Sequence, residues 1–97
     1  MTHTRMNHRP IIRALRAFYP NAVAIYANKR KWTVAYKVVL RLDDDTPTGS
    51  LYQAITHALD GDARFRLSQK CTNTYAFGAH TQVWVQIPSY LVHERSL

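Results

Sequence analysis

The 97-residue sequence has one cysteine, three glycines and no long hydrophobic run. The lone Cys71 excludes an intrachain disulfide, and a single thiol is typical of a protein in a reducing compartment. No apolar stretch approaches the roughly 20 residues that a membrane-spanning helix needs. The first ten residues also lack the apolar core of a signal peptide. We therefore expect a soluble cytoplasmic protein without a membrane partner.

Acidic residues are absent from the first 42 residues, which hold nine Lys or Arg. The remaining residues hold four basic and six acidic ones, so the net charge of +7 comes from the first part of the chain. The isoelectric point is about 10.0. A one-sided basic excess of this size is typical of proteins that contact polyanions, although it also serves solubility alone.

Hydrophobic periodicity predicts two helices and four strands. Apolar residues at helical spacing predict helices over residues 7–20 and 50–61. Runs rich in β-branched and aromatic residues predict strands over residues 22–28, 31–42, 63–71 and 82–88, with a turn or strand continuation over 72–81. The tip of the first hairpin is expected at residues 28–31, where its type is not the favoured Asn-Gly turn.

Alternation within the strands predicts which side chains face the core. We expect inward-facing Trp32, Val34, Tyr36, Val38, Leu40, Leu42, Phe65, Leu67, Val83, Val85 and Ile87, with Cys71 as a small core residue. The outward positions are Lys31, Thr33, Lys37, Arg41, Arg64, Arg66, Ser68, Lys70, Gln82, Trp84 and Gln86.

The element order αββαββ predicts an α+β fold of one domain over residues 1–97. Two helices with one apolar stripe each and four strands with one apolar face each pack best as two layers. We expect a four-stranded, mostly antiparallel sheet with both helices on one face, as in a permuted ferredoxin-like sandwich. Residues 1–6 are expected to form a flexible N-terminus and residues 89–97 a tail or docked segment. An edge strand and the aromatic residues would also suit a homodimer.

Three basic groups are candidates for binding nucleic acid or another partner. The first is the outward sheet face, where Lys37, Arg41, Arg64, Arg66 and Lys70 surround Trp84, an indole on which a base can stack. The second is the hairpin tip, with Lys29, Arg30 and Lys31. The third is the helical stripe of Arg9, Arg13 and Arg16. Each group is also what a solvated sheet face, turn or helix would show.

The first hypothesis is therefore a small, non-catalytic module that binds RNA or single-stranded DNA. The alternative is a small phage or mobile-element inhibitor that docks on a host nucleoprotein complex, as anti-CRISPR proteins do, with only size and charge behind the comparison. The third is a metal-independent, toxin-type ribonuclease that would use Arg64, Arg66, Tyr75 and His80.

Cofactors and metals are not expected. None of the five histidines stands at metal-ligand spacing from Cys or another His, and the Asp43–Asp45 run lacks the alternation and closing Glu of a calcium loop.

Overall fold

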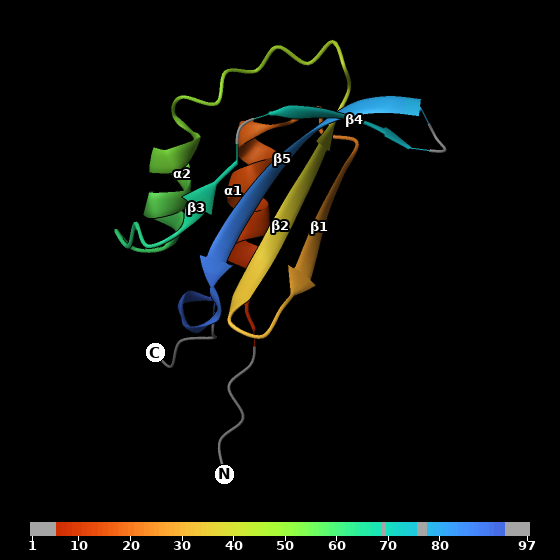
Figure 1. Cartoon of the computed structure of the whole chain (residues 1–97). Helices are drawn as coiled ribbons and strands as arrows, with labels where there is room; N and C mark the ends of the chain where they lie inside the picture. Colours follow the sequence, from red (N-terminus) through yellow and green to blue (C-terminus); the bar gives the residue numbers. More distant parts are fainter. Residues whose placement is uncertain (1–5, 69, 76–77, 93–97) are drawn as a thin grey trace.

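The computed structural model describes residues 6–68, 70–75 and 78–92. These residues form two helices, an antiparallel sheet and one short 3-10 helix (Figure 1). In order they are α1 (Arg9–Phe18), β1 (Ala24–Lys29), β2 (Thr33–Leu40), α2 (Leu51–Ala58), β3 (Arg66–Leu67), β4 (Cys71–Tyr75), β5 (Gly78–Pro88) and η1 (Ser89–Leu91). The α+β class predicted from the sequence is confirmed.

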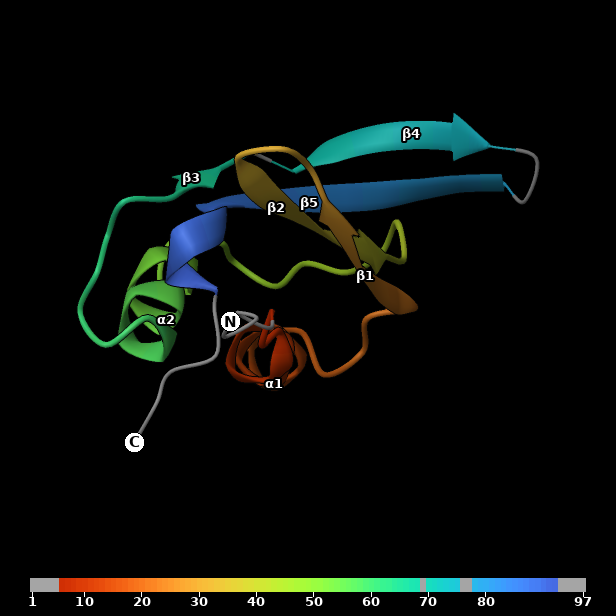
Figure 2. The ribbon, with the colours of Figure 1, turned by 90° about the horizontal axis from the view of Figure 1, so that it is seen from below.

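The strands pair in the order β1-β2-β5-β3, and β4 pairs with β5 on the same edge as β3. Every described pairing is antiparallel. In the centre, Val34 of β2 lies opposite Ile87 of β5, and Leu40 lies opposite Thr81. Residues 78–80 of β5 pair only with β4, so these two strands extend past the helices as a two-stranded arm (Figure 2).

The predicted third strand is interrupted, and this changes which face its side chains occupy. Ser68 donates its backbone N–H to the Trp84 carbonyl at 2.9 Å, whereas Cys71 lies opposite Gln82. The chain thus takes three steps on this edge against two on β5, which is a β-bulge. A one-residue offset moves the following side chains to the other face. The prediction of a buried Cys71 is therefore wrong, because its side chain is exposed.

Both helices lie on the same side of the sheet (Figure 2). Pro10 stands in the first turn of α1, where its missing N–H costs no hydrogen bond. Ile11 and Leu15 of α1 are buried against the sheet, while its arginines Arg9, Arg13 and Arg16 are exposed. After α2, Gly61 has a φ of +90°, the left-handed conformation expected beyond a helix end.

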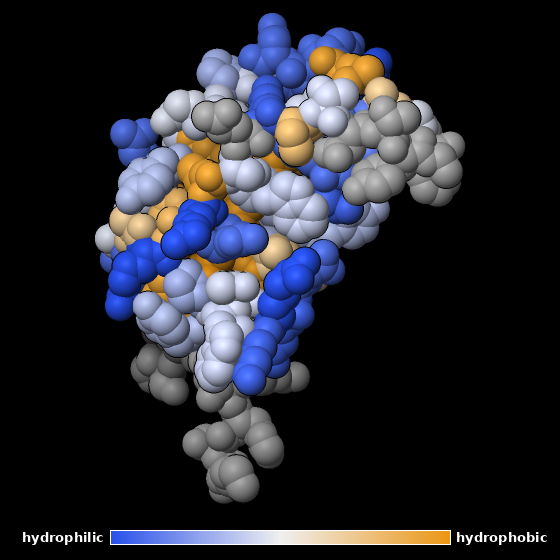
Figure 3. All heavy atoms as spheres, in the orientation of Figure 1, coloured by the Kyte–Doolittle hydropathy of each residue, from blue (hydrophilic) through white to orange (hydrophobic). Residues whose placement is uncertain are grey.

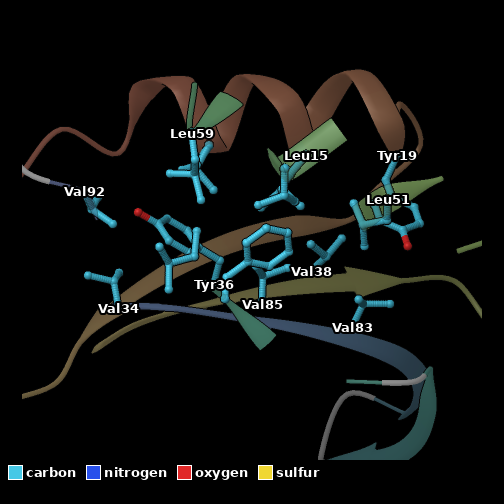
Figure 4. Close-up of a cluster of buried hydrophobic side chains, with 14 of the residues drawn as sticks. Leu15, Tyr19, Val34, Tyr36, Val38, Leu51, Leu59, Val83, Val85 and Val92 are labelled. Carbon is cyan, nitrogen blue, oxygen red and sulfur yellow. The ribbon is translucent and has the colours of Figure 1, made fainter. Parts of the chain in front are cut away.

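Buried apolar side chains fill the space between the helices and the strands. Figure 4 shows Leu15 and Tyr19 on the α1 side of this core and Val34, Val83 and Val85 on the strand side. The predicted inward residues Val34, Tyr36, Val38, Leu40, Val83, Val85 and Ile87 are each fully buried. Their alternation along β2 and β5 leaves the residues between them on the opposite face, which we call the open face.

Two aromatic or apolar predictions fail at the ends of β2. The hairpin turn is centred on residues 31 and 32, since Arg30 N–H donates to the Thr33 carbonyl at 2.8 Å. Trp32 therefore lies at the tip with 74% of its surface exposed, and Leu42, beyond the other end of β2, is 55% exposed. Neither residue faces the core, because the strand alternation stops at the strand ends.

The described residues next to the two chain ends pack against the rest of the fold. Met6, expected in a flexible segment, packs against the core. Of the two alternatives expected for the C-terminal segment, residues 89–92 take the docked one, since Ser89 N–H donates to the Trp32 carbonyl and Val92 is buried. The expected ends at residues 1–5 and 93–97 lie outside the described residues.

Candidate nucleic-acid interface

A row of three side chains crosses the open face of the sheet. Tyr26 of β1 lies opposite Lys37 of β2, and Lys37 lies opposite Trp84 of β5. The Lys37 ammonium nitrogen is 5.2 Å from the centre of the Tyr26 ring and 5.5 Å from the Trp84 ring. Both distances are within the range of cation–π attraction. The row therefore places one positive charge between two aromatic rings on the face away from the helices.

Trp84 is anchored to the neighbouring edge through Ser68. The Trp84 backbone N–H donates to the Ser68 hydroxyl at 2.7 Å, and the Ser68 hydroxyl donates to the Trp84 carbonyl at 3.3 Å. The indole N–H donates to the Gln82 side-chain oxygen at 3.2 Å. The indole is half-buried and lies on the open face, the side on which the sequence predicted it.

A second row lies one step closer to the hairpin tip. Arg66 of β3 lies opposite Gln86 of β5, and Gln86 lies opposite Ala35 of β2. Arg66 and Gln86 are both exposed. They line a shallow pocket of about 470 Å³ together with Thr33 and Pro88. A guanidinium and an amide thus stand next to the aromatic row.

The hairpin tip adds further cations at this end of the sheet. Lys29, Arg30 and Lys31 are all exposed. The Lys31 ammonium nitrogen is 5.2 Å from the centre of the exposed Trp32 ring. Figure 3 views the face away from the helices and shows strongly hydrophilic side chains over the lower end of the β1–β2 hairpin.

A broad groove of about 920 Å³ lies at the other end of the open face. Its walls include the exposed apolar side chains of Val23, Tyr26 and Leu42. Lys37 and His80 also line it. The groove therefore continues the aromatic row with a more apolar surface.

The other predicted cations are placed elsewhere or engaged with neighbours. Arg41 forms an ion pair with Asp43 at 3.3 Å. Arg64 makes a two-pronged contact with the Asp62 carboxylate and lies over the Tyr90 ring. These arginines therefore have local partners at the margins of the open face.

Lys70 is not on the open face, because the bulge turns it toward the loop between β2 and α2. Its ammonium donates to the carbonyl oxygens of Asp44 and Thr46 at 3.3 and 2.5 Å. The stripe of Arg9, Arg13 and Arg16 lies on the helix layer, on the far side of the molecule from Trp84. The predicted cations are thus divided between both sides of the molecule, and Lys37 and Arg66 remain on the face itself.

Sequence reasoning missed two aromatic residues of this surface. Tyr26 is 52% exposed and completes the central row. Alternation in the first strand, where Ala24, Tyr26 and Asn28 share a face, is the signal that could have found it. Trp32 was missed because the turn lies further along the chain than the sequence indicates.

The four parts proposed for a ribonuclease are not gathered in one place. Arg66 lies opposite Gln86, six residues along β5 from His80, which is about 20 Å of strand. The side chain of Tyr75 lies outside the described residues. Arg64 is held by Asp62. His80 is therefore not next to Arg66, and the phenol that lies beside Arg64 is that of Tyr90, which the hypothesis did not name.

In the described ranges, no three or more His, Cys, Asp or Glu side chains come together as a metal site would require. Within the same ranges, neither helix has the length and apolar character needed to cross a membrane.

Comparison with known proteins gives no family for this chain. No family model matches it, and no curated protein or solved structure is significantly similar to it.

Proposed function

We propose that the protein binds single-stranded nucleic acid, RNA or DNA, on the open face of its sheet. The observation that carries the proposal is the Tyr26–Lys37–Trp84 row, with its ammonium held between two rings. Aromatic rings that stack bases beside cations that neutralise phosphates are the parts from which single-strand binding surfaces are built.

Each group would contact a separate part of the ligand. Bases would stack on Trp84 and Tyr26, and the Lys37 ammonium would neutralise an adjacent phosphate. Arg66 and the cations of the hairpin tip would contact further phosphates of the nucleic-acid backbone, in the direction of β1 and β2. The exposed amide of Gln86 would reach a base edge. Binding is then expected to depend on salt and only weakly on sequence.

The test is fluorescence anisotropy with a labelled single-stranded oligonucleotide. Trp84→Ala is expected to weaken binding by about 5- to 150-fold, the equivalent of the 1–3 kcal/mol that one stacked base contributes. Lys37→Glu should also weaken binding, and its loss of affinity relative to the wild type should grow as salt is lowered. Arg13→Glu makes the same change of charge on α1 and serves as the matched control.

Three results would reject this function. The first is no binding by the wild-type protein at low salt. The second is affinity that stays flat between low and moderate salt. The third is an equal loss with Arg13→Glu and Lys37→Glu, since net charge alone would then explain the binding.

A second candidate function is favoured by the apolar groove. Val23, Tyr26 and Leu42 are each more than half exposed around it, and exposed apolar patches often mark protein interfaces. A small inhibitor that docks on a nucleoprotein complex would use this groove for protein and the neighbouring cations for nucleic acid. A partner that stays bound after nuclease digestion, and is lost with Leu42→Glu, would favour docking on protein.

We also propose that the fold is a permuted ferredoxin-like sandwich. Rotating the element order of that fold puts its first hairpin at β1 and β2 and brings the last strand into the centre of the sheet. The order β1-β2-β5-β3 with both helices on one face supports this assignment. An experimental structure with a different strand order would reject it.

A further inference from the structure

Three alternate side chains of β5 form one hydrogen-bonded chain along the open face. The Trp84 indole N–H donates to Gln82 Oε1 at 3.2 Å. The other end of the same amide, Gln82 Nε2, lies 2.8 Å from His80 Nε2. Gln82 is only 2% exposed, although it faces away from the helices. A buried amide must have its hydrogen bonds satisfied, so this chain is a fixed part of the structure.

The chemistry of the three groups determines which ring nitrogen of His80 carries the proton. An indole N–H can only donate, so the amide atom beside it must be the oxygen. The amide atom beside His80 is then the NH₂ group, which also only donates. His80 Nε2 must therefore accept, which requires the neutral ring with its proton on Nδ1. The Gly78 carbonyl lies 3.4 Å from that Nδ1 and can accept this proton's hydrogen bond.

From this geometry we propose that Gln82 and His80 are positioning residues for Trp84, and that protonation of His80 releases the indole. In the neutral state the indole N–H is occupied by Gln82, so Trp84 offers a ligand only its ring face. When Nε2 carries a proton, it can no longer accept from the Gln82 amide. The amide must then turn its oxygen toward His80, and its NH₂ group faces the indole N–H, which breaks that hydrogen bond.

The consequence for binding rests on the proposed function. With the neutral ring, stacking on Trp84 is tolerant of sequence, because every base has a π-face. With the protonated ring, the freed indole N–H can donate to a base or phosphate oxygen, and a positive charge is added beside the groove. Acidification should therefore tighten binding to single strands and change the presentation of Trp84 together.

Other charged and titratable groups surround the groove beside His80. Tyr26 of β1, Lys37 of β2, and Arg41 and Asp43 beyond β2 line the groove with it. On β4, Cys71 lies opposite Gln82. None of these side chains is hydrogen-bonded to the indole nitrogen of Trp84 in the described part of the chain. If the environment of the indole changes with pH through Gln82, substitution of His80 should therefore abolish that change.

The experiment follows tryptophan emission of the free protein between about pH 8 and pH 5, the range in which imidazoles change charge. Trp32→Phe is the background, so that Trp84 is the single emitter. We expect the emission maximum to shift with acidification. His80→Gln supplies an amide oxygen that can accept from Gln82 at every pH, and should hold the emission at its neutral-pH position.

Gln82→Met removes the hydrogen-bonded link at similar volume. Its emission should be independent of pH at a position different from that of His80→Gln. His57→Gln, on the exposed side of α2, is the matched control and should keep the full shift. A shift that persists in His80→Gln, or no shift in the Trp32→Phe background, would overturn the proposal. If Gln82→Met fails to fold by circular dichroism, His80→Gln and His57→Gln still decide it.

The emission test needs no nucleic acid, so it separates this inference from the proposed function. Oligonucleotide affinity is measured at the same pH values with the same variants. An emission shift without any binding would reject the function and keep the positioning role. Binding whose tightening on acidification is equal in wild type and His80→Gln would reject the positioning role and keep the function.

Discussion

The face of the sheet that the helices cover, which we call the closed face, and the open face are built from alternate residues of the same strands. They differ in how many polar side chains they hold. On the closed face, Val38 of β2 and Val83 of β5 are fully buried beneath the helices. One residue further along β2, Val39 lies opposite Gln82, in a row with hydrogen-bonding side chains. The comparison shows that period-two alternation separates the apolar core from a more polar surface within one strand.

The largest effect is expected from placing the same charge on each face. Val38→Lys puts an ammonium in the core without a partner, which costs several kcal/mol. A small domain has only about 5–15 kcal/mol of stability, so this variant should be largely unfolded. Val39→Lys places the ammonium on the open face and should fold. Urea denaturation followed by circular dichroism measures both, and equal destabilisation would contradict the division into two faces.

The second effect concerns how many phosphates the open face would neutralise under the proposed function. Each Lys or Arg that contacts a phosphate contributes about one unit to the salt dependence of binding. Lys37→Gln and Arg66→Gln should therefore each reduce the slope of log affinity against log salt by about one. Arg16→Gln, on the helix layer, should leave the slope unchanged. A slope reduced equally by all three would mean that the ligand does not distinguish the faces.

How far the sequence predicts these two faces differs from one element to another. The closed face of β2 and β5 follows from alternation, because a residue buried on one side forces its neighbour to the other. Cys71 and Lys70 were placed on the wrong faces, since a bulge has no clear signal in a single sequence. Trp32 was misplaced for a related reason, because the turn without Asn-Gly left the hairpin register open.

The candidate site depends on pairing between strands, which the sequence does not state. Lys37 and Trp84 were both predicted to face outward, but their contact requires the β2–β5 register. Tyr26 joins them only through the β1–β2 register. The distribution of charge was the weakest inference, because the arginines of α1 and Lys37 of β2, all within the first 42 residues, lie on opposite sides of the molecule.

A third effect, of about 1 kcal/mol, separates two buried tyrosines of the core, Tyr36 on β2 and Tyr19 at the end of α1. Tyr36 has its hydroxyl 2.7 Å from His8 Nδ1, and burial raises its pKa. Tyr19 is also buried, and its hydroxyl has no hydrogen-bond partner in the described part of the chain. Burial and the nearby Asp44 carboxylate raise the pKa of Tyr19 to about 12.

Removing these two hydroxyls should therefore have opposite effects. Tyr36→Phe leaves His8 without its partner and should destabilise the fold by about 1 kcal/mol, whereas Tyr19→Phe should be neutral or stabilising. Chemical denaturation of the two variants gives the comparison directly. A loss with Tyr19→Phe as large as with Tyr36→Phe would show that the Tyr19 hydroxyl is satisfied in solution.

The smallest effect is expected at the Asp44–Thr46 turn, whose carbonyl oxygens accept hydrogen bonds from Lys70 away from the open face. The side-chain and backbone hydrogen bonds from Thr46 lower the pKa of Asp44, and the charge of Lys70 adds to this effect. Because the folded-state pKa is below the ordinary value, ionised Asp44 stabilises the fold above that value, and this contribution is lost as the pH falls through the folded pKa.

Asp44→Asn keeps an oxygen that can accept from Thr46 but removes the titration. Its melting temperature should change by only a few degrees at neutral pH, and it should fall less than that of the wild type on acidification below about pH 4. Asp43→Asn, whose carboxylate pairs with Arg41, is the matched control. If the acid sensitivity of Asp44→Asn and Asp43→Asn is the same, the Asp44–Thr46 turn does not hold Lys70 through its charge, and the bulge alone directs that side chain.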